Sequence, residues 1–102
     1  MYSLFVTAQA ENDLDDIVAY ITQKLFNPSA AGELLDGVEA CYENLRRTPY
    51  MYGECSDTKL RAEGYRMAVI GSYVLVYKID EASKNVLIMR YFYGARDYVR
   101  LL

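Results

Sequence analysis

The sequence predicts an α+β domain, in the order β-α-α-β-β-β, in which a two-helix hairpin packs on one face of an antiparallel sheet. Two apolar stripes with helical spacing fill the first half of the chain, and three alternating segments joined by turns fill the second half. A chain of 102 residues has room for one hydrophobic core. We therefore expect residues 1–102 to form a single domain.

The first helix is expected to follow a short strand at residues 2–7, which are rich in Tyr, Phe and Val. Thr7 is a suitable N-cap, and Glu11 and Asp13 place negative charge in the opening turns, where the helix dipole favours it. The apolar stripe of this helix consists of Ala10, Leu14, Ile17, Val18, Ile21 and Leu25.

The second helix is expected to begin at Asn27 and Pro28, because Asn caps helices and Pro is tolerated in the first turn. Thr48 and Pro49 should end it. Its apolar stripe consists of Ala31, Leu34, Leu35, Val38, Tyr42 and Leu45. The short link between the two stripes predicts an antiparallel helical hairpin. Residues 48–60 are polar and lack a period, so we expect a loop there.

Three strands are expected in the second half, at residues 65–70, 73–79 and 86–93. Gly71 and Ser72 form a tight turn between the first two, and residues 80–85 form a longer turn before the third. Short links of this kind predict an antiparallel meander. Residues 95–102 are expected to form a short tail.

Composition excludes several classes of protein. The chain has no His, which removes Ser-His and Cys-His nucleophile pairs and the commonest metal ligand. Cys41 falls on a helical stripe and Cys55 in the predicted loop, without a CxxC motif, so we expect free thiols in a reducing compartment. We expect no metal and no cofactor. Neither a signal peptide nor an apolar run of membrane-spanning length is recognisable, so the cytoplasm is the expected location.

Charge is distributed unevenly along the chain. The net charge is −3, with −7 on residues 1–45 and +4 on residues 46–102. One interpretation is that the basic second half binds an anionic partner. The other is that the two halves attract each other within the fold.

Several segments resemble the RelE/ParE toxins of type II toxin–antitoxin systems. VTAQAENDLDDIVAYI and NPSAAGELL are similar to the opening strand and hairpin of that family. EGYRMAVIGSYVLVYKID and VLIMRYFYGARDYVRLL resemble its meander and arginine-bearing tail. The resemblance implies a toxin of a plasmid stabilisation module that arrests growth and is neutralised by a cognate antitoxin. RelE-like members cleave mRNA on the ribosome without a metal, and ParE-like members act on DNA gyrase.

The nuclease alternative requires basic and aromatic side chains that converge on the RNA. Arg66, Arg96 and Tyr98 are the candidate catalytic residues for that alternative. Other positions at which RelE-like enzymes are basic hold apolar residues here, namely Ala68, Val74 and Ala95. The resemblance therefore supplies only part of a nuclease site.

The gyrase alternative is favoured by two segments that look like ParE proteins in particular. One is the T-A-x-A-E-x-D-L pattern that begins at Thr7, and the other is the pair Arg96-Asp97. A negative net charge also disfavours a protein that must enter an RNA-rich site. We therefore favour an inhibitor over an enzyme. An inactive family member that serves only as a binding module is a third alternative.

Contacts with the target or the antitoxin are expected from basic residues of the second half, namely Lys59, Arg61, Arg66, Arg90 and Arg96. We expect Arg66, Arg90 and Arg96 to share one surface, against which the antitoxin places acidic side chains. Arg90 alternates with Val86 and Ile88, which predicts that the three side chains share one sheet face. The alternative to a functional role for Arg90 is an arginine that pairs within the fold or snorkels past its apolar neighbours. The sequence predicts no oligomeric state.

Overall fold

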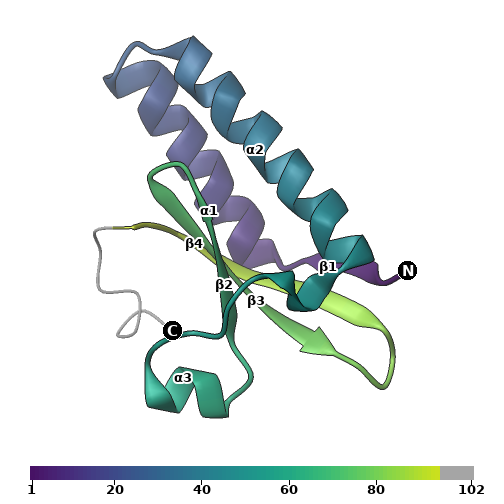
Figure 1. Ribbon diagram of the computed structural model, residues 1–102. Coiled ribbons are helices and arrows are strands. Elements are labelled where there is room, and N and C mark those ends of the chain that lie inside the picture. The colour runs from purple at the N-terminus through teal and green to yellow at the C-terminus, as the bar shows by residue number, and fades with distance from the viewer. Residues whose placement is uncertain (95–102) are drawn as a thin grey trace.

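The computed structural model describes residues 1–94, and places a helical hairpin on one face of a four-stranded sheet (Figure 1). The elements are β1 (Ser3–Val6), α1 (Ala8–Ala19), a π-helix (Tyr20–Lys24), α2 (Pro28–Arg47), a 3-10 helix (Pro49–Met51), α3 (Thr58–Ala62), β2 (Arg66–Ile70), β3 (Tyr73–Asp80) and β4 (Asn85–Tyr93). The α+β class and the expected order of the main elements are confirmed. The expected tail at residues 95–102 lies outside the described residues.

Both hairpin helices begin where their capping residues predict. The Thr7 side chain accepts a hydrogen bond from the Ala10 amide at 3.1 Å, and the Asn27 side chain accepts one from the Ala30 amide at 3.1 Å. Each cap satisfies an amide that has no partner inside its helix. The first apolar stripe continues past α1 into a single π-helical turn that the sequence did not predict.

The prediction of a purely antiparallel sheet is wrong for one pair of strands. The order is β1-β4-β3-β2, and β1 pairs with β4 in parallel, from Ser3 opposite Asn85 to Val6 opposite Ile88. The other two pairs are antiparallel, as the meander predicts. The parallel pair arises because the helical hairpin carries the chain away from β1, and β1 then lies beside the last strand instead of its sequence neighbour.

A β-bulge interrupts β4. Val76 of β3 lies opposite Arg90, whereas Tyr77 lies opposite Ile88, so Met89 is the extra residue on β4. The bulge changes which residues of β4 face the helices. Before it Val86 and Ile88 belong to the main core, and after it Tyr91 does.

The core between the hairpin and the sheet joins residues from both layers. Its buried members are Ala10, Ile21, Ala31, Leu34, Val38, Cys41, Leu45, Ala68, Leu75, Tyr77, Val86, Ile88 and Tyr91. A smaller cluster of Val74, Val76 and Phe92 lies on the other face. Apolar burial on both faces of β3 explains its nearly continuous apolar sequence.

The segment at residues 48–60 contains regular structure where the sequence predicted only a loop. Pro49–Met51 forms a 3-10 turn, and Thr58 begins the short helix α3. The Asp57 side chain caps α3 by accepting a hydrogen bond from the Leu60 amide at 2.9 Å. Five residues are too few to show a helical period, so this helix gave no pattern in the sequence. Cys41 and Cys55 are free thiols, as expected, and both are buried.

The hairpin approaches the sheet closely at Gly37 of α2. A Cβ atom added to Gly37 would lie 2.8 Å from Cγ2 of Ile70 on β2, which is closer than van der Waals contact allows. A Cβ atom added to Gly32, which lies earlier on the same helix, would meet no atom within 4 Å. Glycine at position 37 therefore sets the spacing between α2 and β2.

Replacement of these two glycines by alanine should have clearly different effects on stability. Gly32→Ala should raise the free energy of unfolding by roughly 0.5–1 kcal/mol, because glycine inside a helix is unfavourable. Gly37→Ala has the same intrinsic gain but pushes Ile70 away, so we expect it to be about 1 kcal/mol less stable than Gly32→Ala. Urea denaturation measures both variants. Equal gains would contradict a tight α2–β2 contact.

Candidate functional site

Arg90 is bound by a carboxylate of the hairpin. Its Nε donates a hydrogen bond to Asp13 Oδ2 at 2.7 Å, and its Nη2 donates to Asp13 Oδ1 at 3.2 Å. The guanidinium carbon lies 4.8 Å from the centre of the Phe92 ring. The Asp13 side chain is 11% exposed and that of Arg90 25%, so the pair is largely removed from water. The predicted alternative of a paired arginine is confirmed.

Asp13 also accepts a hydrogen bond from the edge of β4, at a point that the neighbouring strand β1 does not reach. β1 ends at Val6, and the Thr7 amide donates to the Ile88 carbonyl at 3.1 Å. Beyond that point the Tyr91 amide, on the edge of β4, donates to Asp13 Oδ2 at 3.1 Å. Burial by itself raises the pKa of Asp13, but the hydrogen bonds from Arg90, Tyr91 and Gln9 outweigh it and hold the pKa below its usual value.

The sequence predicted that Arg90 shares a sheet face with Val86 and Ile88, and this prediction is wrong. Two-residue alternation holds only in an unbroken strand, and the extra residue Met89 turns every later side chain of β4 to the opposite face. Arg90 therefore lies on the face of Val76 and Phe92.

Arg66 holds the segment that follows α2. Its Nη2 donates to the carbonyl of Tyr50 at 3.2 Å and to that of Tyr52, and its Nη1 lies 3.7 Å from Glu54 Oε1. The guanidinium carbon lies 5.3 Å from the centre of the Tyr50 ring. The side chain is only 16% exposed. Through these contacts Arg66 fixes the chain at residues 50–54.

Arg66 and Arg90 lie on opposite faces of the sheet, which corrects the expectation of one shared surface. Arg66 pairs with Tyr77 and Arg90 pairs with Val76, and these partners are consecutive residues of β3. Consecutive residues of a strand point to opposite faces. Arg96, the third member of the expected surface, lies outside the described residues, as does Tyr98.

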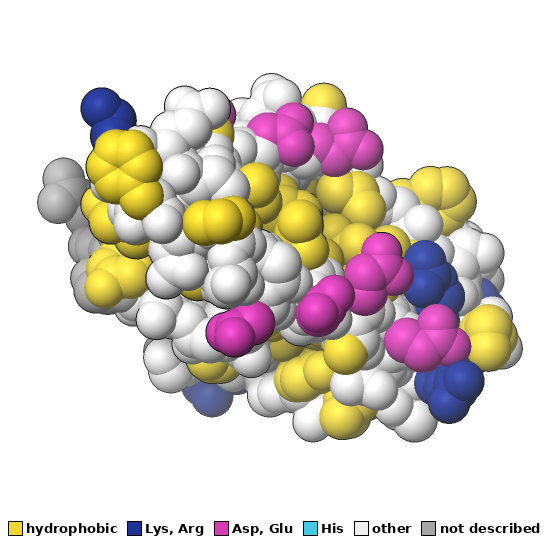
Figure 2. Space-filling model, turned by 90° about the horizontal axis from the view of Figure 1, so that it is seen from above, with side chains coloured by type: hydrophobic (Ala, Val, Ile, Leu, Met, Phe, Trp, Pro, Cys, Tyr) yellow, Lys and Arg dark blue, Asp and Glu magenta, His cyan; other side chains and the backbone are white. Residues whose placement is uncertain are grey.

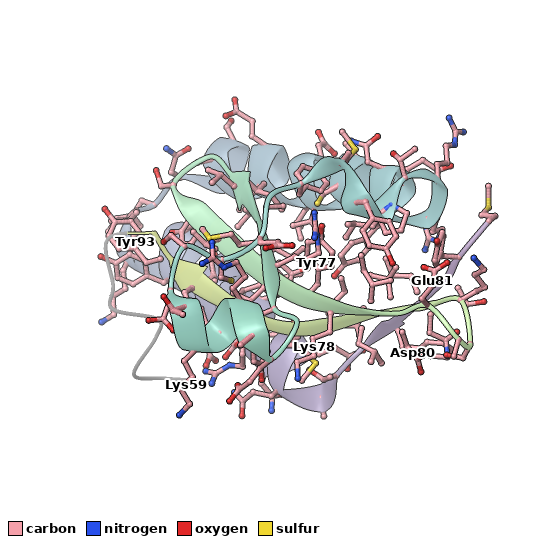
Figure 3. All side chains as sticks on the ribbon, turned by 60° about the horizontal axis from the view of Figure 1, so that its bottom comes forward. Lys59, Tyr77, Lys78, Asp80, Glu81 and Tyr93 are labelled. Carbon is pink, nitrogen blue, oxygen red and sulfur yellow. The ribbon has the colours of Figure 1, made fainter. Side chains whose placement is uncertain are left out.

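The remaining predicted cations lie on α3. Lys59 is exposed and projects from the helix (Figure 3). Arg61 is 51% exposed and forms a long ion pair of 3.9 Å with Glu54. These two side chains are accessible to a partner, whereas Arg66 and Arg90 are mostly engaged inside the fold.

Arg66 and Arg90 therefore do not converge on one sheet face. Ala68 and Val74, which occupy two positions that are basic in the nuclease pattern, are 2% and 5% exposed and belong to the two cores. Within residues 1–94 no cluster of three His, Cys, Asp or Glu side chains could hold a metal ion. Nor does any helix in that range have the length and apolar character needed to cross a membrane.

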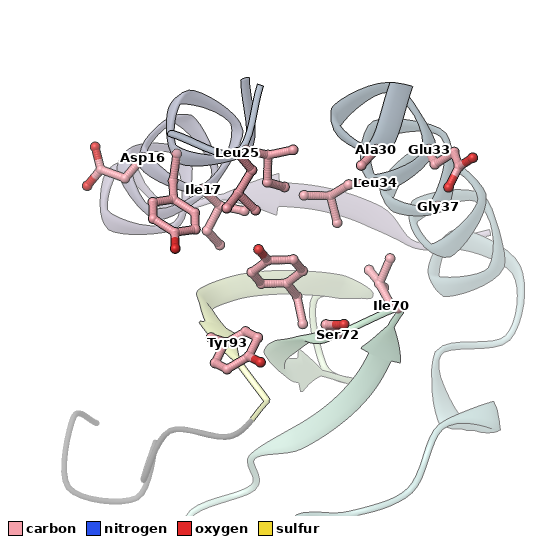
Figure 4. A pocket seen from close by; sticks show the side chains of 14 residues that line it. Asp16, Ile17, Leu25, Ala30, Glu33, Leu34, Gly37, Ile70, Ser72 and Tyr93 are labelled. Atoms are coloured by element: carbon pink, nitrogen blue, oxygen red, sulfur yellow. The ribbon is translucent and has the colours of Figure 1, made fainter. Parts of the chain in front are cut away.

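The sequence did not indicate a groove of about 1000 Å³ between the far end of the hairpin and the turn that joins β2 and β3 (Figure 4). Its lining comes from α1, the π-helix, α2, the β2–β3 turn and the end of β4. The residues are Asp16, Ile17, Tyr20, Ile21, Leu25, Ala30, Glu33, Leu34, Gly37, Ile70, Gly71, Ser72, Tyr73 and Tyr93.

The groove forms because the hairpin extends past the end of the sheet. Ile70 is the last residue of β2 and lies against Gly37 of α2, and Tyr93 is the last residue of β4. The part of α2 that precedes Gly37, residues 28–36, adds about 13 Å of helix beyond that contact. Tyr20, Leu25 and Tyr93 are about half exposed there. The overhang depends on where the hairpin packs along the sheet, which is a long-range contact without a local sequence signal.

Comparison with known proteins gives consistent relatives. The family model for the ParE toxin of the parDE type II toxin–antitoxin system matches residues 4–98. The crystal structure of the toxin–antitoxin complex RelBE2 from Mycobacterium tuberculosis contains a chain that is 26% identical, with a TM-score of 0.64 and coverage of 90% of this chain and 96% of that one. A chromosomal ParDE system from P. aeruginosa contains a chain that is 19% identical, with a TM-score of 0.68 and coverage of 89% and 94%. No curated protein sequence matches significantly.

Arg66 and Arg61 should differ sharply in their contribution to stability. Arg66→Met should lower the free energy of unfolding by about 2 kcal/mol, because it leaves two loop carbonyls without their charged donor. Arg61→Met removes an exposed, long ion pair and should change it by less than about 0.5 kcal/mol. Urea denaturation at neutral pH compares the two. Similar small effects would show that Arg66 does not hold the segment at residues 50–54.

Proposed function

This chain belongs to the ParE family of toxins from type II toxin–antitoxin systems, and on that premise we propose that it inhibits DNA gyrase until a cognate antitoxin neutralises it. The observation that carries the choice of gyrase is the engagement of Arg66 and Arg90 within the fold, on opposite faces of the sheet. A nuclease without His or metal needs cations that converge on one phosphate. Among residues 1–94 these two arginines do not converge.

The proposed contacts with gyrase come from α3 and from the tail. Lys59 and Arg61 are exposed on one short helix, where they can meet an acidic surface of the target. Arg96 is a further proposed contact. Arg66 contributes indirectly, because it fixes the segment that leads into α3. Arg90 also contributes indirectly, because its contact with Asp13 holds α1 against β4.

An antitoxin partner is supported by the relatives, since both similar solved structures come from toxin–antitoxin systems. Gyrase is a cytoplasmic target, so the proposed site of action is the cytoplasm. Growth arrest on induction, and stabilisation of a plasmid that carries the module, are the expected cellular effects.

The second candidate function is ribosome-dependent cleavage of mRNA. Its support is the 26% identity to the toxin–antitoxin complex RelBE2. Arg66, Arg96 and Tyr98 would then be the catalytic residues. This alternative requires Arg66 to leave the loop carbonyls that it now binds. An inactive binding module, the third alternative, predicts no effect of induction on growth.

A supercoiling assay tests the proposal. The purified protein should inhibit gyrase, and Lys59→Glu with Arg61→Glu should weaken the inhibition at least tenfold, because both exposed charges are reversed. Arg46→Glu with Arg47→Glu, on the exposed end of α2, reverses the same number of charges, is the matched control and should have little effect. Translating ribosomes provide the second arm. Site-specific cuts in mRNA without inhibition of gyrase would overturn the proposal in favour of the nuclease.

A further inference from the structure

We propose that Asp16 and Glu33 select the antitoxin, and that the groove between the hairpin and the β2–β3 turn takes an amphipathic helix with Lys or Arg on both of its flanks. The inference rests on the proposed function in one respect, namely that the partner is the antitoxin. It adds the chemistry of the segment that binds and the residues of this chain that recognise it.

The floor of the groove is apolar. Ile21 and Leu34 line it and are 4% and 7% exposed, and Ile70 and Tyr73 belong to the edge of the same core. Tyr20, Leu25 and Tyr93 line its open side and remain about half exposed. A row of apolar side chains from a partner would extend the core and cover these three residues.

Carboxylates stand on both rims of the groove. Asp16 comes from α1 and Glu33 from α2, and the two lie on opposite flanks (Figure 4). The outer face of the hairpin, seen from above, also carries acidic side chains on both sides of apolar ones (Figure 2). Within residues 1–94 neither Asp16 nor Glu33 forms an ion pair, whereas Asp13 binds Arg90 and Glu43 binds Arg47.

Unneutralised carboxylates on both rims determine the charge of the partner. Cations on both flanks of a docked segment would meet Asp16 and Glu33, and anions there would be repelled. The sequence predicted the reverse, an acidic segment that pairs with Arg66, Arg90 or Arg96. Arg66 and Arg90 are engaged by the fold. Among residues 1–94 the charged side chains that line the groove are both negative.

A helix fits the groove better than an added strand. The outer edge of β2 is partly covered, because the Met67 amide donates to the Gly53 carbonyl at 3.2 Å and the Cys55 amide donates to the Tyr65 carbonyl at 3.3 Å. An added strand would have to displace that segment. A helix presents apolar residues at intervals of three and four positions and lies in a groove between helices and a sheet.

A second copy of this chain is a poorer occupant. A symmetric dimer presents the same patch from both subunits. It would bring two sets of the Asp16 and Glu33 carboxylates together without added cations. The net charge of −3 works in the same direction.

Two synthetic helical peptides test the inference. They share one apolar face of Leu and Ile and differ only in Lys or Glu at the flanking positions, and fluorescence anisotropy measures their binding to the full chain. The Lys peptide should bind at least tenfold more tightly than the Glu peptide. This preference should shrink at high salt. Asp16→Lys with Glu33→Lys should reverse it.

A matched control separates the rims from overall charge. Asp36→Lys with Glu39→Lys changes the net charge equally, on exposed residues of α2 that do not line the groove, and should leave the preference intact. Equal binding of the two peptides, or equal reversal by both double variants, would overturn the inference. If the chain forms a stable dimer and Tyr20→Ser dissociates that dimer, the groove belongs to a second copy. This result would also overturn the inference.

The outcome is independent of the gyrase assay. If gyrase is not inhibited but the Lys peptide is still preferred, the proposed target fails and the charge selection by the groove stands. If gyrase is inhibited but the peptides do not differ, the target stands and the groove inference fails. The variant with Asp16→Lys and Glu33→Lys should inhibit gyrase as the unaltered chain does.

Discussion

The Asp13 carboxylate is the contact on which the rest of the structure depends. It accepts hydrogen bonds from the Arg90 side chain at 2.7 Å and from the Tyr91 amide at 3.1 Å, at the point where β1 no longer pairs with β4. One side chain thus satisfies a strand edge and neutralises a largely buried guanidinium. Either charge alone at that position would be costly, because little water reaches it.

This contact also divides the charged residues between structure and recognition. It ties the first half of α1 to β4, while the far end of the hairpin extends past the sheet and leaves an apolar groove. The acidic first half and the basic second half of the chain do attract each other, as one interpretation of the charge pattern held, at Asp13 and Arg90. Asp16 and Glu33 have no such partner within residues 1–94, and they remain for a binding segment.

Local features were predictable and long-range ones were not. The caps at Thr7 and Asn27, the hairpin and the meander follow from side-chain chemistry and from periodicity. The parallel position of β1 depends on a partner far along the chain. Alternation predicted the wrong sheet face for Arg90, because the one-residue bulge at Met89 has no sequence signature of its own. The groove was missed because it depends on where the hairpin packs along the sheet, which is a contact between residues far apart in the sequence.

A double-mutant cycle on Asp13→Ala and Arg90→Ala tests the central contact most directly. Urea denaturation at neutral pH gives the free energy of unfolding of the unaltered chain, each single variant and the double variant. The structure predicts an interaction energy of about 1–3 kcal/mol, because two mostly buried charged groups share hydrogen bonds. Effects that add within about 0.5 kcal/mol would show that the two residues act independently, and would contradict the account.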